Sequence, residues 1–145
     1  MKILSLDVSG NYSSIAMLND DEVNSFTQTH DRKDRPNWDS LDGLAFACGP
    51  GSYTALRITA SFLKAIAEVK TLPLVAISNL ESIAQEASTW IDDEETKIYV
   101  AIEADTKESY FCNYQKNNNT LKQISVETVL QLSLIHISEP TRRRG

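Results

Sequence analysis

Short apolar runs, each closed by turn-forming residues, open the chain. The first run, "KILSL", leads into the turn Asp7–Gly10, and the runs "SSIAMLN" and "EVNSFTQT" are separated by Asn19–Asp21. Asn and Asp favour tight turns between antiparallel strands. The pattern predicts three β-strands in a meander. A loop is expected over residues 30–40, which are polar, lack a period and contain Pro36.

The period of the pattern changes after Ser52. The strand "GLAFAC" is closed by "GPGS", and a helix is predicted from about Tyr53 to Val69. Six residues at helical spacing form the face of this helix that is expected to point inward, and we call it the inward stripe: Leu56, Thr59, Ala60, Leu63, Ile66 and Ala67. The strand "LPLVAI" follows, and then a helix over residues 79–87, opened by Ser78 and Glu81 as a capping box. Strands that alternate with helices indicate an α/β fold with a mixed sheet and flanking helices.

A second domain is predicted to begin after the charged stretch "DDEE". Two strand candidates, "KIYVAIEA" and "ESYFCNYQ", start afresh there. We therefore expect a first domain over residues 1–95 and the start of a second, truncated one over residues 96–131.

Composition narrows the class of protein. The chain has 145 residues, is 41% hydrophobic and 23% charged, and carries a net charge of −6. These values are typical of soluble globular proteins, and an acidic chain without a basic stripe is a poor nucleic-acid binder by itself. No apolar run is long enough to span a bilayer, and Asp7 interrupts the apolar start, so we expect no signal peptide. Cys48 and Cys112 are expected to be free thiols in a reducing cytoplasm.

Two turns are candidates for binding an anion. The first contains Asp7, Ser9 and Gly10 after the first strand, and the second contains Gly49, Gly51 and Ser52 before the first helix. Glycines let backbone N–H groups approach phosphate oxygens, and a helix N-terminus attracts anions. Ser52 is also expected to cap the helix through its side chain. The alternative is that both are ordinary turns, because the lysine of a P-loop and the spacing of a dinucleotide-binding loop are missing.

The first predicted helix has a second apolar face. Ala55, Ile58 and Phe62 lie off the inward stripe. A helix that is apolar on all sides is either deeply buried or part of an interface. The residues alone leave both possibilities open.

No catalytic constellation is visible. His30 lies in a predicted loop and His136 near the C-terminus, and neither has a nucleophile or metal-ligand partner at a known spacing. Glu103, Asp105 and Glu108 form an acidic group that we interpret as solvated strand ends. The residues alone indicate an α/β domain suited to binding.

The strings "GPGSYTALR" and "LPLVAISNLESIAQEA" closely resemble the TsaB (YeaZ) family. The family pattern G-P-G-[ST]-[FY]-T-G-L-R is matched over Gly49–Arg57, with Ala55 in place of its last glycine, and "LDVSG" and "IEADTKESY" resemble two further family stretches. The resemblance implies the two-lobed actin-like ATPase (ASKHA, ribonuclease H-like) fold. It also implies a non-catalytic subunit in the synthesis of N6-threonylcarbamoyladenosine on tRNA.

The resemblance also implies partners. A TsaD-like transferase subunit and a TsaE-like ATPase are expected, with ATP used by the complex, no cofactor or metal held by this chain, and tRNA bound only through the complex. Self-association through the same face is a further expectation. The predicted partner interface consists of Tyr53, Leu56, Arg57, Ala60, Leu63 and Lys64. The alternative is a free-standing ATPase or phosphotransferase of the same fold; a protease is disfavoured because no nucleophile–base pair is present.

Three departures from the family pattern are visible. Relatives carry a helix after the residue that corresponds to His30, and this chain has "DRKDRPNWDS" instead. The Arg and Asp of an I-D-A-R stretch are Asp105 and Glu103 here. The tail begins with "LSLIHISEPTR", which is the translation of a transposase-based sequencing adaptor, so residues 132–145 are expected to be non-native. Leaving out this tail makes the chain more acidic still.

Overall fold

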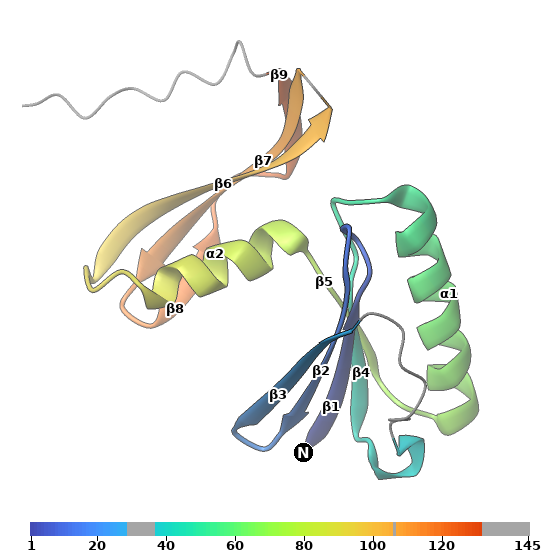
Figure 1. Ribbon diagram of the computed structural model, residues 1–145. Helices are drawn as coiled ribbons and strands as arrows, with labels where there is room; N and C mark the ends of the chain where they lie inside the picture. Colours follow the sequence, from blue (N-terminus) through green and yellow to red (C-terminus); the bar gives the residue numbers. More distant parts are fainter. Residues whose placement is uncertain (29–36, 106, 132–145) are drawn as a thin grey trace, which may run out of the picture.

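The computed structural model describes residues 1–28, 37–105 and 107–131. Two β-sheets, each with one helix packed on it, form two layers (Figure 1). Predictions that concern residues 29–36 and 132–145, including the replaced family helix and the adaptor-like tail, lie outside the described residues.

The first sheet has five strands in the order β3-β2-β1-β4-β5. The strands are β1 (Lys2–Asp7), β2 (Ser13–Asn19), β3 (Glu22–Gln28), β4 (Gly43–Ala47) and β5 (Leu74–Ile77). β1, β2 and β3 are antiparallel, whereas β4 runs parallel to both β1 and β5. The predicted meander and mixed sheet are confirmed.

Helix α1 (Tyr53–Lys70) connects β4 to β5 and covers one face of this sheet (Figure 1). Its inward residue Leu63 is fully buried and packs in one core with Leu4 and Leu44. The periodic stripe therefore identified the buried face of α1 correctly. A single-turn 3₁₀ helix, η1 (Trp38–Ser40), precedes β4 within the segment that was predicted to be a loop.

The second sheet contains β6 (Glu95–Asp105), β7 (Glu108–Asn117), β8 (Thr120–Gln123) and β9 (Thr128–Gln131). β7 pairs with each of the other three strands in antiparallel fashion. β6 and β7 were predicted, but the two short strands were not.

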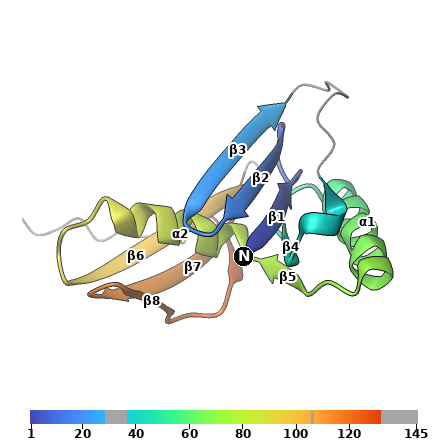
Figure 2. The same ribbon diagram turned by 90° about the horizontal axis from the view of Figure 1, so that it is seen from below.

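Helix α2 (Asn79–Thr89) packs mainly against β6, β7 and β8 of the second sheet. Its buried residues Leu80 and Ala84 share a core with Ile98, Val100, Cys112 and Tyr114. Figure 2 shows α2 lying along β6 and β7, away from α1. The two hydrophobic cores therefore divide near Ser78, before α2, and the domain boundary expected at residue 95 stays a prediction. Ser78 caps α2 by accepting a hydrogen bond from the Glu81 backbone N–H, as predicted.

No helix among the described residues is long and apolar enough to cross a membrane.

Candidate functional site

The outer face of α1 carries an apolar seam formed by Ile58, Phe62, Ala65 and Val69. The spacing of four, three and four residues is that of a helix-pairing stripe. The side chains of Ile58, Phe62 and Val69 are 64%, 50% and 80% exposed. A contiguous exposed apolar stripe of this kind marks an interaction surface.

Two aromatic residues flank this seam. Trp38, next to β4 in sequence, packs edge-on against Phe62 with ring centroids 6.3 Å apart. At the other end of the helix, the Arg57 guanidinium lies 5.4 Å from the centre of the Tyr53 ring. Both contacts restrict side chains on the face that a partner would meet, which lowers the entropy lost on binding.

Basic residues border the seam although the chain is acidic overall. Arg57, Lys64 and Lys70 belong to α1, whereas Glu68 is its only acidic residue. Lys70 is paired with Asp39 at 2.5 Å. Arg57 and Lys64 are exposed, so they can attract acidic groups on a partner.

The predicted interface residues fall into three groups. Tyr53, Arg57 and Lys64 are exposed on the outer face, and Leu56 and Ala60 are half-buried. Leu63 is fully buried in the core, because it lies at the centre of the inward stripe. Its assignment to the interface was therefore wrong for this structure.

The off-stripe residues were the better guide to the outer face. Ile58 and Phe62 are exposed as the second apolar face required, whereas Ala55 is half-buried. Ala65 and Val69 were missed as members of this face. Extending the spacing from Ile58 and Phe62 by three and then four residues would have identified both.

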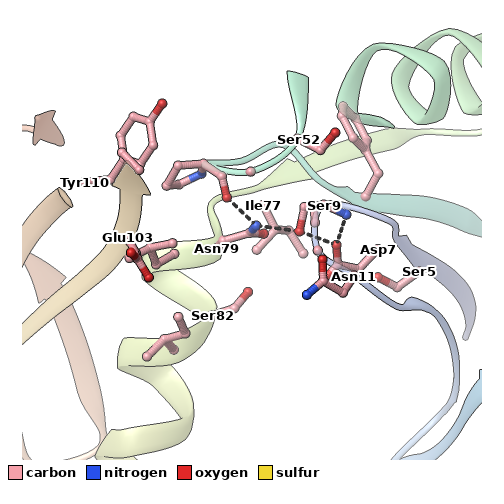
Figure 3. Close-up of a pocket in the computed structure, with 18 residues that line it drawn as sticks. Ser5, Asp7, Ser9, Asn11, Ser52, Ile77, Asn79, Ser82, Glu103 and Tyr110 are labelled. Carbon is pink, nitrogen blue, oxygen red and sulfur yellow. Dashed lines mark hydrogen bonds between the residues drawn. The ribbon is translucent and has the colours of Figure 1, made fainter. Parts of the chain in front are cut away.

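The second candidate site is the cleft between the two layers, with a volume of about 830 Å³. Figure 3 shows that Asp7, Ser9 and Ser52 reach it from the first layer, and Glu103 and Tyr110 from the second. The structure thus brings both predicted anion-binding turns to one place. They belong to neighbouring strand ends, because β1 and β4 are parallel.

The oxygens of the first turn are engaged internally. One carboxylate oxygen of Asp7, Oδ1, accepts hydrogen bonds from the Ser9 backbone N–H at 2.8 Å and from Ser9 Oγ at 2.6 Å. This Asx-type arrangement stabilises the turn itself.

The second turn packs directly against the first. Gly49 has a φ of +109°, which favours glycine, and a Cβ at Gly51 would lie 2.7 Å from the Ser9 carbonyl oxygen. The Ser52 N–H donates to that same oxygen at 2.9 Å. Ser52 occupies the N-cap position of α1, but its side chain makes no capping hydrogen bond. The predicted side-chain cap is therefore wrong. Gly51 allows the close contact between the two turns, and Gly49 provides the positive φ.

The charged residues that line the described part of the cleft are acidic. They are Asp7 and Glu103. Phosphate groups are ordinarily held by Lys, Arg, a metal ion or free N–H groups. A nucleotide in this cleft would therefore depend on a metal ion or on backbone N–H groups, because no Lys or Arg is among the described lining residues.

The acidic group Glu103, Asp105 and Glu108 lies at the β6–β7 turn. The described residues contain no cluster of three or more potential metal ligands. Glu103 and Glu108 are exposed, as expected for solvated strand ends, and the side chain of Asp105 lies outside the described residues.

The two cysteines are free thiols, as predicted, with Cys48 exposed and Cys112 buried. Partial desolvation raises the pKa of the Cys48 thiol, which lowers its thiolate content at neutral pH. Its exposure alone therefore gives no reason to assign it a nucleophilic role.

The topology defines the class of protein. A three-stranded meander that continues in parallel through α1, within a mixed five-stranded sheet, is the architecture of an actin-like ATPase (ASKHA) lobe. Two solved structures share this fold. YeaZ from Pseudomonas aeruginosa superposes with a TM-score of 0.77 over 97% of this chain and 72% of that chain, at 24% identity. A protein described as similar to peptidase YEAZ, also from P. aeruginosa, gives 0.77 at 23% identity.

Sequence comparison identifies the family. The model of TsaD, tRNA N6-adenosine threonylcarbamoyltransferase, matches residues 34–139. The tRNA threonylcarbamoyladenosine biosynthesis protein TsaB of Escherichia coli is 28% identical over 152 residues, and that of Haemophilus influenzae is 33% identical over 126 residues. The chain belongs to the TsaB (YeaZ) family.

The matches are partial in length. They include 94% and 77% of this chain, but only 65% of the E. coli protein and 52% of the H. influenzae protein.

Proposed function

We propose that this chain is a non-catalytic scaffold subunit in the synthesis of N6-threonylcarbamoyladenosine on tRNA, and that it pairs with a TsaD-like transferase subunit through the outer face of α1. The exposed α1 seam is the observation that carries the proposal. It presents large apolar side chains at helix-pairing spacing on an otherwise acidic chain.

The rest of the complex supplies the chemistry in this proposal. The TsaD-like subunit holds the transfer site, a TsaE-like ATPase uses ATP, and tRNA is bound by the assembled complex in the cytoplasm. The names of the relatives, as biosynthesis proteins of this modified nucleoside, support the assignment. An acidic chain whose cleft is lined by no Lys or Arg among the described residues is consistent with a supporting role.

Introducing a positive charge within the seam tests the interface. Ile58→Arg places a cation among apolar side chains without touching the core, since Ile58 is 64% exposed. We expect the affinity for the TsaD-like subunit to fall about 30-fold or more, as for an interface hot spot. Titration calorimetry with the purified TsaD-like subunit gives the dissociation constant. Ala60→Arg is less suitable, because Ala60 is half-buried.

Val126→Arg is the matched control. Val126 is a 79% exposed apolar residue that precedes β9, on the other sheet from α1. The affinity of Val126→Arg for the TsaD-like subunit should equal that of the unmodified chain. Equal affinities for all three proteins, with unchanged circular dichroism, would exclude α1 as the interface. Light scattering of the chain alone shows whether the same seam also supports a homodimer.

A further inference from the structure

Asn79, the first residue of α2, makes three hydrogen bonds that all lead to the first layer. Its side-chain Nδ2 donates to Ser9 Oγ and to the Pro50 carbonyl oxygen, each at 2.8 Å. Its backbone N–H donates to the Gly49 carbonyl oxygen at 2.7 Å. Figure 3 shows the amide pointing away from α2 and between the two first-layer turns.

These bonds connect parts of the molecule that otherwise belong to separate cores. α2 packs through Leu80 and Ala84 with the second sheet. Ser9 follows β1, and the Gly49–Pro50 turn lies between β4 and α1, so both belong to the first layer. Asn79 therefore lies where the second layer is attached to the first.

We propose that Asn79 is a latch that fixes the orientation of the α2 layer relative to the first sheet and to the start of α1. The width of the inter-sheet cleft then depends on this one side chain. The latch does not depend on the function proposed above, because it concerns contacts within the chain only.

The chemistry of the contact requires an amide. Ser9 Oγ donates its proton to Asp7, so it can only accept from Asn79. The Pro50 carbonyl is also an acceptor, and one NH₂ group supplies both donors. In Asn79→Asp the side chain keeps nearly the same shape, but a carboxylate oxygen that cannot donate would face the two acceptor oxygens.

The test measures the distance between the layers. Spin labels are attached to cysteines introduced by Lys64→Cys in α1 and Lys122→Cys in β8, two exposed positions, one in each layer. Cys48 is replaced by Ser so that its exposed thiol is not labelled. We expect Asn79→Ala and Asn79→Asp to broaden the distance distribution about twofold or to shift its maximum. The exchange of the Ser52 amide hydrogen, bonded to Ser9, should become about tenfold faster, because two hydrogen bonds are lost nearby.

Asn11→Ala is the matched control. Asn11 lines the same cleft, and its side chain makes no hydrogen bond within the described part of the chain, so its distribution should match that of the unmodified protein. Native exchange at core amides such as those of Leu63 and Cys112 verifies that both layers remain folded.

Two outcomes would overturn the latch. One is an unchanged distance distribution in both Asn79 variants while core exchange stays native. The other outcome applies if the Asn79 variants lose the slow amide exchange of the core. In that case Ser9→Ala is used, because it removes the acceptor of the Asn79 hydrogen bond from the first layer. An unchanged distance distribution in Ser9→Ala would then refute the proposal. A broader distribution in Ser9→Ala would support it.

Discussion

Gly51 shows how closely the two turns at the cleft approach each other. A Cβ built there lies 2.7 Å from both Cβ and the carbonyl oxygen of Ser9, and the carbonyl belongs to backbone that cannot rotate away. We expect Gly51→Ala to lower the free energy of unfolding by about 1–3 kcal/mol, as overpacking usually does. Urea denaturation followed by circular dichroism measures the change.

Gly10→Ala provides the comparison in the same region. A Cβ at Gly10 meets nothing within 4 Å, so this variant should be as stable as the unmodified chain or more stable by less than about 1 kcal/mol. Equal losses of unfolding free energy in both variants would mean that the close contact between Gly51 and Ser9 is not what makes an alanine unfavourable at position 51.

Tyr114 should make stability fall in alkaline solution. Its side chain is 1% exposed, and burial raises the pKa of its phenol above that of an unfolded tyrosine, about 10. Below pH 10 both states keep the proton. Above it the unfolded state releases the proton first, so the free energy of unfolding declines by up to about 1.4 kcal/mol per pH unit.

Tyr114→Phe removes this contribution, and within the described residues the Tyr114 hydroxyl has no hydrogen-bond partner to lose. Urea unfolding at pH 8, 9, 10 and 11 should show the stability of the unmodified chain falling relative to that of the variant above pH 10. Parallel pH profiles would contradict a buried, neutral Tyr114.

Residue-level expectations that rest on local pattern had mixed outcomes, because the side-chain cap expected at Ser52 is absent. The Ser78 cap follows from a local rule and was found. Leu63 was assigned to both the inward stripe and the interface, and only its fully buried position separates these roles. The part played by Asn79 gave no signal in the sequence, because its partners Ser9 and Pro50 lie 70 and 29 residues away.

Helix α1 ends in a strained residue. Thr71 has a φ of 55°, in the left-handed region, and its N–H bonds to the carbonyl oxygens of Ala67 and Glu68 as a C-cap. A β-branched residue destabilises the fold in this left-handed conformation because its side chain crowds the backbone, whereas glycine adopts the conformation readily. We expect Thr71→Gly to raise the free energy of unfolding by about 1 kcal/mol.

Glu68→Gly, one turn earlier within α1, is the control for the cost of glycine itself. It should lower stability by about 0.5–1 kcal/mol, since it has no strain to relieve. Thermal unfolding of both variants measures the two effects. A loss of stability in Thr71→Gly would show that the cap is not strained in solution.

Elements with a clear period were predictable, and short ones were not. The α1 stripe and the alternating β6 and β7 strands gave bounds within a few residues of those observed. β8 and β9 have four residues each, too few for a period to emerge, and form because β7 offers edges on which they pair. For α2, the capping box indicated where the helix begins but could not indicate which sheet covers the helix.

The arrangement of the whole molecule came from the family resemblance more than from the pattern. Strand order β3-β2-β1-β4-β5 requires the chain to pass from an edge strand back to the centre of the sheet. Apolar periodicity does not encode such a crossover. The cleft depends on the same long-range order, since its walls come from residues as distant in sequence as Asp7 and Glu103.

The lining of the cleft leads to a test of the alternative of a free-standing ATPase. A nucleotide would have to place its phosphates near Asp7 and Glu103, and no Lys or Arg is found among the described residues that line this space. Asp7 Oδ1, a natural position for a metal-bound water, already accepts two hydrogen bonds from Ser9. We therefore predict no saturable binding of ATP with Mg²⁺ up to about 1 mM, the range of weak association.

Titration calorimetry with the full chain tests this prediction, and the double variant Asp7→Asn, Glu103→Gln serves as the comparison. If acidic repulsion is what excludes the nucleotide, removing both carboxylates should allow weak binding of ATP without Mg²⁺. A micromolar dissociation constant for the unmodified chain would instead favour the ATPase. It would also require the two turns to separate by breaking the Ser52–Ser9 hydrogen bond, which amide exchange at Ser52 would reveal as faster exchange on nucleotide addition.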